Sequence, residues 1–143
     1  MSDGARDDDD DLTRLGERLT TRAFGRAHEH HAAIASTNDR ALAWAAEGAP
    51  QGALVTADRQ VEGRGRRGRA WASAPGDLAF SLVFRPGSYG PGRASGGDRW
   101  GALGLAVGVG VREGLAPWLR EVELKWPNDL RVGGRKLAGI LCE

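Results

Sequence analysis

The chain has 143 residues, the length of one ordinary domain, which is enough to bury a core and excludes a second full domain. Its formal net charge of +1 conceals an acidic start: without the six aspartates and one arginine of residues 1–11, 19 basic residues face 13 acidic ones. The single cysteine, Cys142, excludes an internal disulfide or a multi-cysteine zinc site, and the absence of a long apolar run indicates a cytoplasmic protein without a membrane segment.

Residues 1–22 are predicted to be a disordered or weakly helical tail, polar to residue 11 and weakly amphipathic from Leu12 to Arg22. The pattern from Ala23 to Ile34 indicates an edge strand. Its three histidines, at positions 28, 30 and 31, lack the spacing of a metal site, because only the first two would share a face of a strand. Ordinary strand or surface histidines are therefore the favoured interpretation.

A helix is predicted next, over Arg40 to Glu47, and Gly48 and Pro50 end it. Ser36 stands three positions before Asp39, which is typical of a capped helix start. The hydroxyls of Ser36 and Thr37 at a helix N-terminus could also bind a polar ligand, but capping alone is the favoured reading of this spacing.

Two short apolar runs, Gly52 to Asp58 and Asp77 to Arg85, have the length of buried strands. The segment from Pro86 to Gly97 is rich in glycine and proline and reads as a loop. Trp100 to Leu119 has helical spacing, and its glycines would weaken a helix yet allow it to pack closely on a sheet. These glycines are Gly101, Gly104, Gly108, Gly110 and Gly114.

The C-terminal part reads as strands from Val122 to Trp126 and from Leu130 to Val132, then a returning strand from Lys136 to Cys142. Gly133-Gly134 between the last two is a strong signal for a two-residue hairpin turn. The order of elements predicts an α+β fold, a mixed and largely antiparallel sheet with helices packed on one side. Because the last strand runs to the end of the chain, we expect a domain that is truncated at its C-terminal end.

The most informative segment is the loop from Gln60 to Trp71. Its four arginines alternate with glycines, which places dense positive charge on a backbone that can approach a ligand closely. Such a loop is suited to an anion, although Arg-Gly repeats are also common in disordered RNA-binding segments. The arginines are Arg64, Arg66, Arg67 and Arg69, and the glycines are Gly63, Gly65 and Gly68.

Three separated segments together resemble one family, the catalytic domain of biotin protein ligase, also called biotin-[acetyl-CoA-carboxylase] ligase. They are Ser36-Thr37-Asn38, the loop from Gln60 to Trp71, and Lys125-Trp-Pro-Asn-Asp-Leu130 followed by Gly134 to Leu141. The resemblance covers residues 23–143, as the N-terminal portion of that domain. It implies ATP-dependent activation of biotin to biotinyl-5′-AMP, with Mg²⁺ bridging the phosphates, and transfer to a lysine of a biotin carboxyl carrier domain.

The resemblance also implies roles for individual residues. The catalytic residues would be Arg66, Lys136 and Asp129, the last orienting or deprotonating the incoming lysine. Biotin would be bound by Ser36, Thr37, Asn38, Gln60, Arg64, Gly65, Arg66 and Lys136. The nucleotide would be bound by Arg64, Arg69, Trp71 and Asn128. The partner would be a biotin carboxyl carrier protein or domain of acetyl-CoA carboxylase or a related carboxylase, and a homodimer stays open.

Each motif has a plainer alternative. Trp71 and Trp126 could fill the core, Asn128-Asp129 could be a turn, and Lys136 could be an exposed hairpin charge. Glu62 departs from the small residue that the family usually has before the Gly-Arg-Gly run. The N-terminal 22 residues are too short for a helix-turn-helix domain, so no DNA-binding domain is expected.

Two other functions compete with biotin ligation, and a third is excluded. Lipoate or octanoate ligase-like enzymes share the fold, although the Arg-Gly loop with Lys-Trp-Pro-Asn-Asp favours biotin. A nucleic-acid-binding module could use the basic loop and the tryptophans. A P-loop nucleotidase is excluded because the glycine-rich loop lacks the Gly-Lys-Ser/Thr ending.

Overall fold

The computed structural model describes residues 12–85 and 102–143, which fall into two compact units. The first takes in residues 12–64 and 70–85, and the second takes in residues 65–69 and 102–143. Three predicted features lie outside the described residues: the polar tail of residues 1–11, the loop from Pro86 to Gly97, and the first two residues of the helix predicted from Trp100 to Leu119.

The N-terminal elements of the first unit are shorter than predicted. A 3-10 turn, η2 (Leu12–Arg14), leads into α1 (Leu15–Arg18), and Leu19 already has an extended backbone. The strand β1 (His28–His31) has four residues, although a strand from Ala23 to Ile34 was expected. Residues 22–27 run through bends and a turn in which Gly25 has a φ of 76°, so regular pairing begins only at His28.

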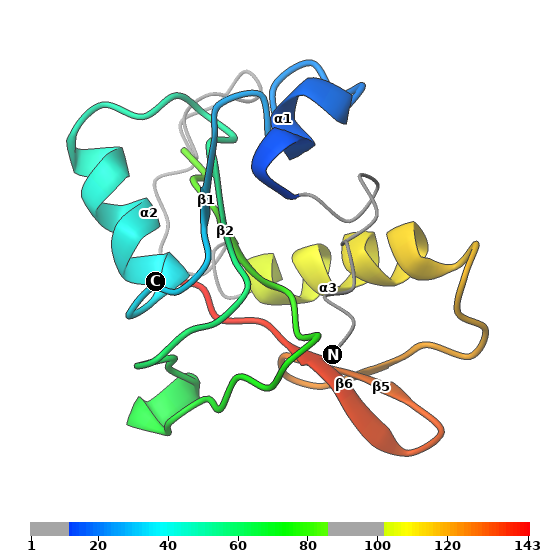
Figure 1. Ribbon diagram of the computed structural model, residues 1–143. Coiled ribbons are helices and arrows are strands. Elements are labelled where there is room, and N and C mark those ends of the chain that lie inside the picture. Colours follow the sequence, from blue (N-terminus) through cyan, green and yellow to red (C-terminus); the bar gives the residue numbers. More distant parts are fainter. Residues whose placement is uncertain (1–11, 86–101) are drawn as a thin grey trace, which may run out of the picture. The chain divides into compact units, whose positions relative to one another are not determined.

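A three-stranded sheet with the order β1-β2-β3 forms the centre of the first unit (Figure 1). The middle strand, β2 (Leu54–Ala57), is buried throughout. It pairs in parallel with β1 and antiparallel with β3 (Ala79–Leu82). Because β1 pairs only with β2 among the described strands, it is an edge strand, as predicted. An isolated parallel bridge between Ile34 and Gln60 lies beyond the regular part of this pair.

The helix α2 (Thr37–Ala46) packs against one face of this sheet (Figure 1). Ala41, Trp44 and Ala45 recur at helical spacing and face the sheet, where Val55 and Val83 are buried. The guanidinium of Arg85 donates to the carbonyl oxygens of Ala45 and Ala49, which satisfies acceptors that the end of a helix leaves open. Small side chains let the helix lie close to the sheet and fix where its N-terminus is presented.

Three polar side chains meet on the opposite face of the sheet. The Thr56 hydroxyl lies 2.8 Å from His28 Nε2 and 3.0 Å from His30 Nδ1. The two imidazoles therefore share one face of the strand, as predicted, and both lie within hydrogen-bond distance of the Thr56 hydroxyl. The pKa of His28 is lowered by burial and by the neighbouring His30.

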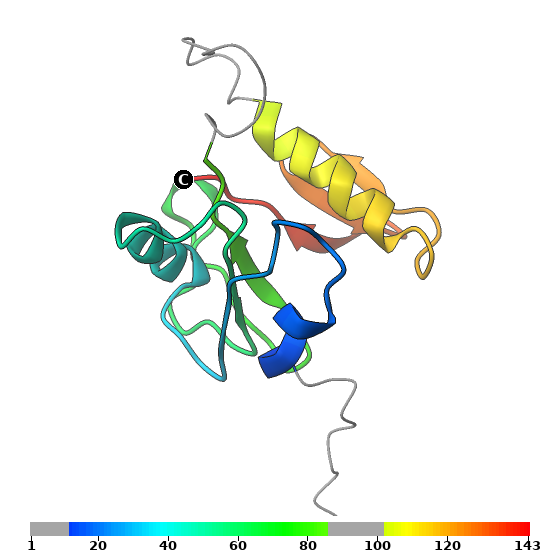
Figure 2. The ribbon, with the colours of Figure 1, turned by 90° about the horizontal axis from the view of Figure 1, so that it is seen from above.

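The second unit contains α3 (Leu103–Leu115) and an antiparallel sheet of β4 (Glu123–Lys125), β5 (Asp129–Val132) and β6 (Arg135–Gly139). The helix contacts β4 and β5 (Figure 2). Gly133 and Gly134 have φ values of 55° and 74°, the positive values that a two-residue hairpin turn requires. The predicted hairpin is thus confirmed. The pairing of β5 with β6 shifts its register between Leu130 and Arg131.

Gly108 is the glycine of α3 that allows close packing, a role that was expected for several glycines of this helix. A Cβ on Gly108 would come within 2.6 Å of Leu124 Cδ1 and 3.3 Å of Ile140 Cδ1. By contrast, nothing lies within 4 Å of a Cβ on Gly110 or Gly114. Close approach of helix and sheet therefore depends on Gly108.

The predicted class, an α+β fold with mixed and largely antiparallel pairing, is confirmed. The strands are divided between two three-stranded sheets, and only the pair of β1 with β2 is parallel among the described strands. Within residues 12–85 and 102–143, no helix is long and apolar enough to cross a membrane.

The shifted pKa of His28 predicts a pH-dependent stability. As the pH falls below 6.5, the unfolded chain takes up this proton before the folded chain does, so the free energy of unfolding decreases. Urea unfolding should therefore show a lower midpoint at about pH 5 than at about pH 7, and His28→Gln should flatten the difference. An equal change of the urea midpoint between about pH 7 and about pH 5 in the unmodified chain and in His28→Gln would show that His28 does not cause the pH dependence.

The two helix glycines predict unequal effects of alanine. Gly108→Ala should stabilise the second unit less than Gly110→Ala does, or destabilise it, because Leu124 must shift to admit the methyl group and this cost offsets the gain in helix propensity. Gly110→Ala, the matched control, should stabilise it by about 0.5–1 kcal/mol through helix propensity. Thermal or urea unfolding measures both, and equal effects would show that Gly108 has no special packing role.

Candidate functional site

A buried hydrogen-bond cluster joins the start of α2 to the start of the arginine loop. Gln60 Oε1 accepts from the Thr37 backbone N–H at 2.8 Å and from the Thr37 hydroxyl at 3.0 Å. The Ser81 hydroxyl donates to Thr37 Oγ1 at 2.9 Å. Thr37 is 3% exposed, so these bonds form where water competes little.

Ser36 and Asn38 belong to the same cluster. Ser36 precedes α2 as its N-cap, and its Oγ accepts from the Asp39 backbone N–H at 3.4 Å, which confirms the predicted cap. Asn38 Oδ1 also lies within hydrogen-bond distance of the Ser81 hydroxyl, whose single proton is shared between Asn38 and Thr37. Sequence reasoning missed Ser81, although a polar residue at an inward position of an apolar strand is a usable signal.

The two ends of the arginine loop are held together by backbone contacts. The Trp71 N–H donates to the Gly63 carbonyl at 2.7 Å, and Arg64 forms an isolated bridge with Ala70. A Cβ on Gly63 would lie 2.8 Å from the Trp71 carbonyl oxygen, a contact that real side chains do not make. Glycine is therefore required at this position for the loop to close. Trp71 itself is partly buried.

Arg64 forms a two-pronged ion pair with Asp39 of α2. Its Nη1 and Nη2 each lie 2.6 Å from a different carboxylate oxygen. The hydrogen bonds from Arg64 and its charge lower the pKa of Asp39, so this carboxylate stays ionised. Because the partners are 25 residues apart, the pair ties the loop to the helix.

The tip of the loop, Gly65 to Arg69, belongs to the second unit. It contains a 3-10 turn, η3 (Arg66–Gly68), and the Gly65 N–H donates to the Arg69 carbonyl at 2.7 Å. Arg67 has a φ of 61°, an uncommon value for a residue with a side chain. The tip is therefore a tight reversal with an arginine on either side of its centre.

The second unit also brings two predicted catalytic residues together. Lys136 Nζ lies 2.7 Å from Asp129 Oδ1, and the two side chains are 40% and 21% exposed. Asn128, in the preceding turn, donates from Nδ2 to the Ile140 carbonyl at 2.8 Å. The turn alternative for Asn128 is thus correct, while Asp129 begins β5. Trp126 is 75% exposed and does not fill the core.

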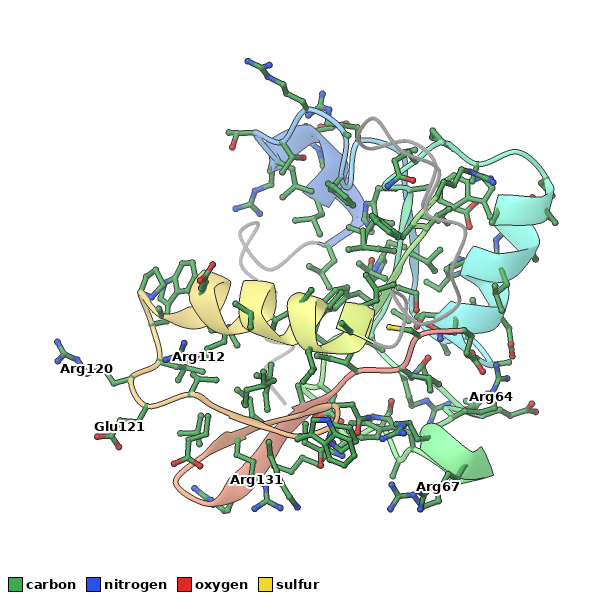
Figure 3. The ribbon with its side chains drawn as sticks, turned by 180° about the vertical axis from the view of Figure 1, so that it is seen from behind. Arg64, Arg67, Arg112, Arg120, Glu121 and Arg131 are labelled. Carbon is green, nitrogen blue, oxygen red and sulfur yellow. The ribbon has the colours of Figure 1, made fainter. Side chains whose placement is uncertain are left out.

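A hollow of about 380 Å³ lies in the second unit, at the end of α3, away from these residues. Arg120 and Glu121 contribute to its wall, but their side chains point outward (Figure 3). Arg112, also in the wall, donates to the Val122 carbonyl at 2.8 Å. None of the sequence-predicted site residues lines this hollow, so it is not the candidate site.

The predicted site residues thus form two groups, one in each unit. The first unit brings together Ser36, Thr37, Asn38, Gln60 and Arg64, with Trp71 at the end of the loop. The second unit holds Gly65, Arg66, Arg69, Asn128, Asp129 and Lys136. Among residues 12–85 and 102–143, no group of three or more metal-ligating side chains is present.

Comparison with known sequences finds one matching family model. The model, described as the biotin/lipoate A/B protein ligase family, matches residues 31–143. Biotin--[acetyl-CoA-carboxylase] ligase from Mycobacterium tuberculosis is 43% identical over 114 residues, which are 76% of this chain and 41% of that protein. The bifunctional ligase/repressor BirA of Bacillus subtilis is 35% identical over 127 residues, 87% of this chain and 37% of that protein.

Solved structures similar to this chain are also biotin ligases. Biotin protein ligase from Aquifex aeolicus, in complex with biotin and ATP, has a TM-score of 0.68 and 32% identity, covering 82% of this chain and 47% of that one. Biotin acetyl coenzyme A carboxylase synthetase from Helicobacter pylori, with bound biotinylated ATP, has a TM-score of 0.68 and 27% identity, covering 80% and 53%. The chain spans about two fifths of the length of the curated relatives it matches.

The close contact at the base of the arginine loop predicts different tolerance of two neighbouring glycines. Gly63→Ala should open the loop, because its methyl group would overlap the Trp71 carbonyl. Gly65→Ala should leave the free chain folded as before, since a Cβ there lies 3.5 Å from the Arg69 carbonyl and φ is −111°. Amide hydrogen exchange of Trp71 measures the difference, and equal protection in both variants would contradict it.

Proposed function

Because this chain belongs to the biotin/lipoate A/B protein ligase family, we propose that its activity is biotin protein ligation. Biotin and ATP would form biotinyl-5′-AMP and pyrophosphate, and the biotinyl group would then pass to a lysine of a carrier domain. The observation that carries the proposal is the buried contact of Gln60 with Thr37, which joins two of the three resembling segments in one cluster. Relatives named as biotin ligases support the same choice.

The first step sets a clear electrostatic requirement. Bringing the carboxylate of biotin to a triphosphate forces like charges together, and fixed cations offset this cost where negative charge develops. We assign this role to Arg64, Arg66 and Lys136. Lys136 is suited to contact the carboxylate and a phosphate oxygen, because an ammonium acts as a compact point charge.

The cluster at the start of α2 is proposed to hold the ureido ring of biotin. A urea offers two N–H donors and one carbonyl acceptor, so it needs a small set of both donors and acceptors. Ser36, Thr37, Asn38 and Gln60 supply hydroxyl and amide groups of that kind, and their mutual bonds keep them in place. Gly65 would let the loop backbone come close to the ligand.

The nucleotide is proposed to lie against Trp71, Asn128 and Arg69, with Arg64 on its phosphates. Trp71 would offer an aromatic face to adenine. The Asn128 side-chain N–H already donates to Ile140, so its carbonyl oxygen is the group suited to accept from the adenine amine. Asp129 would orient or deprotonate the incoming lysine, and Lys136 Nζ lies 2.7 Å from its Oδ1.

Mg²⁺ is proposed as a companion of the triphosphate rather than a resident of the chain. No carboxylate cluster for a divalent cation exists among the described residues, and Asp129 is ion-paired. Mg²⁺ commonly keeps several waters and binds through substrate phosphates. When bound, it would neutralise phosphate charge, and the roles assigned above do not depend on it.

The proposed partner is a biotin carboxyl carrier protein or domain, of acetyl-CoA carboxylase or a related carboxylase, in the cytoplasm. No DNA-binding role is proposed for this chain, although the relative from Bacillus subtilis is named as both ligase and repressor. Competition between biotin and lipoate or octanoate for the same site distinguishes the ligase alternatives.

Lys136→Ala should abolish the activation step. Losing one charge that stabilises the transition state should reduce biotin-dependent ATP/pyrophosphate exchange at least about 100-fold. Arg120→Ala is the matched control, because Arg120 is an exposed cation of the same unit whose side chain points outward and which lies outside the three resembling segments. Near-normal exchange with Lys136→Ala, in a protein of unchanged fold, would exclude the role.

A further inference from the structure

The ion pair between Asp39 and Arg64 places an anion of the protein on the cation that is assigned to the nucleotide. Both carboxylate oxygens accept from Arg64, each at 2.6 Å. We propose that Asp39 is a positioning residue that occupies Arg64 in the ligand-free chain and must release it when a phosphate binds. This inference rests on the proposed function, in which Arg64 contacts the phosphates of ATP.

The geometry makes Asp39 and a phosphate alternatives. Asp39 bonds to the two terminal nitrogens of the guanidinium, in the planar forked arrangement that a phosphate oxygen pair also prefers. Arg64 keeps its charge throughout, because a guanidinium does not deprotonate in proteins. Binding of a phosphate at the same edge of Arg64 is therefore an exchange of one anion for another.

The carboxylate of Asp39 is not needed to cap α2. The cap is provided by Ser36, whose hydroxyl oxygen accepts from the backbone N–H of Asp39 rather than from its side chain. A carboxylate in the first turn of a helix still interacts favourably with the helix dipole, so Asp39 remains stable when Arg64 leaves. The side chain is thus available for a second role.

Because both side chains of the pair are partly exposed, replacing Asp39 by a phosphate on Arg64 costs little free energy. Arg64 and Asp39 side chains are 38% and 50% exposed, which weakens their attraction through solvent screening. Arg40 offers a contrast in the same helix, because it is 26% exposed and bonds to both Glu29 and Glu47. That network is suited to hold structure, whereas the pair of Asp39 with Arg64 is suited to open.

The consequence is a lower apparent affinity for the nucleotide and a loop that stays attached to α2 until the nucleotide arrives. Removing the charge of Asp39 should therefore strengthen nucleotide binding, provided that Arg64 is present. An exposed ion pair of this kind predicts an increase of about two- to fivefold.

Titration calorimetry with ATP and with inorganic pyrophosphate tests the inference on the full chain. Asp39→Asn should bind both about two- to fivefold more tightly than the unmodified chain. The same substitution in an Arg64→Ala background should have no effect, because no guanidinium is left to release. Glu47→Gln is the matched control, because it also removes one carboxylate of α2. The Glu47 carboxylate pairs with Arg40 rather than Arg64, so this substitution should leave the affinity unchanged.

Three outcomes would overturn the inference. Unchanged or weaker binding by Asp39→Asn would show that the carboxylate does not compete. An equal gain in the Arg64→Ala background, or with Glu47→Gln, would show only a change in overall charge. Absence of any ATP or pyrophosphate binding to the unmodified chain would overturn the proposed function together with this inference, whereas binding that Asp39→Asn leaves unaltered overturns the inference alone.

Discussion

The first unit depends on the contact of a single oxygen, Gln60 Oε1, which accepts two hydrogen bonds from the buried Thr37. An amide at the beginning of a loop is thereby fixed to the first residue of a helix 23 positions earlier. Breaking it would leave buried donors without partners, which costs more than the bond contributes. The arginine loop therefore starts from a defined point, next to the cluster that is proposed to bind the ligand.

Two of the cations assigned to catalysis are held by carboxylates in the ligand-free chain, Arg64 by Asp39 and Lys136 by Asp129. A loop with four arginines would otherwise accumulate mutual repulsion. The pairs hold Arg64 beside α2 and Lys136 beside β5 before a ligand arrives. When the nucleotide binds, Arg64 would exchange Asp39 for a phosphate, so its charge would already be on the phosphate when further negative charge develops.

Local signals in the sequence predicted much of this arrangement. The Ser36 cap, the Gly133-Gly134 turn and the buried strand around Val55 depend on neighbouring residues, so their patterns suffice. The lengths of α1 and β1 were overestimated, because the backbone is already extended at Leu19 and a turn at Gly25 precedes the regular part of the strand. Ser81 was missed although its inward position in an apolar strand was a usable signal. Its partners, and the pair of Arg64 with Asp39, could not be predicted, since they depend on how distant segments meet. The division of the strands between two sheets has the same origin.

The central claim is that the start of α2 and the arginine loop bind biotin and a nucleotide rather than a nucleic acid. Titration of biotin into the chain with ATP present, at low and high salt, tests it most directly. The account predicts saturable biotin binding that persists at high salt, because the ureido contacts are neutral and buried. Absence of biotin binding, with RNA binding that falls steeply as salt rises, would contradict it.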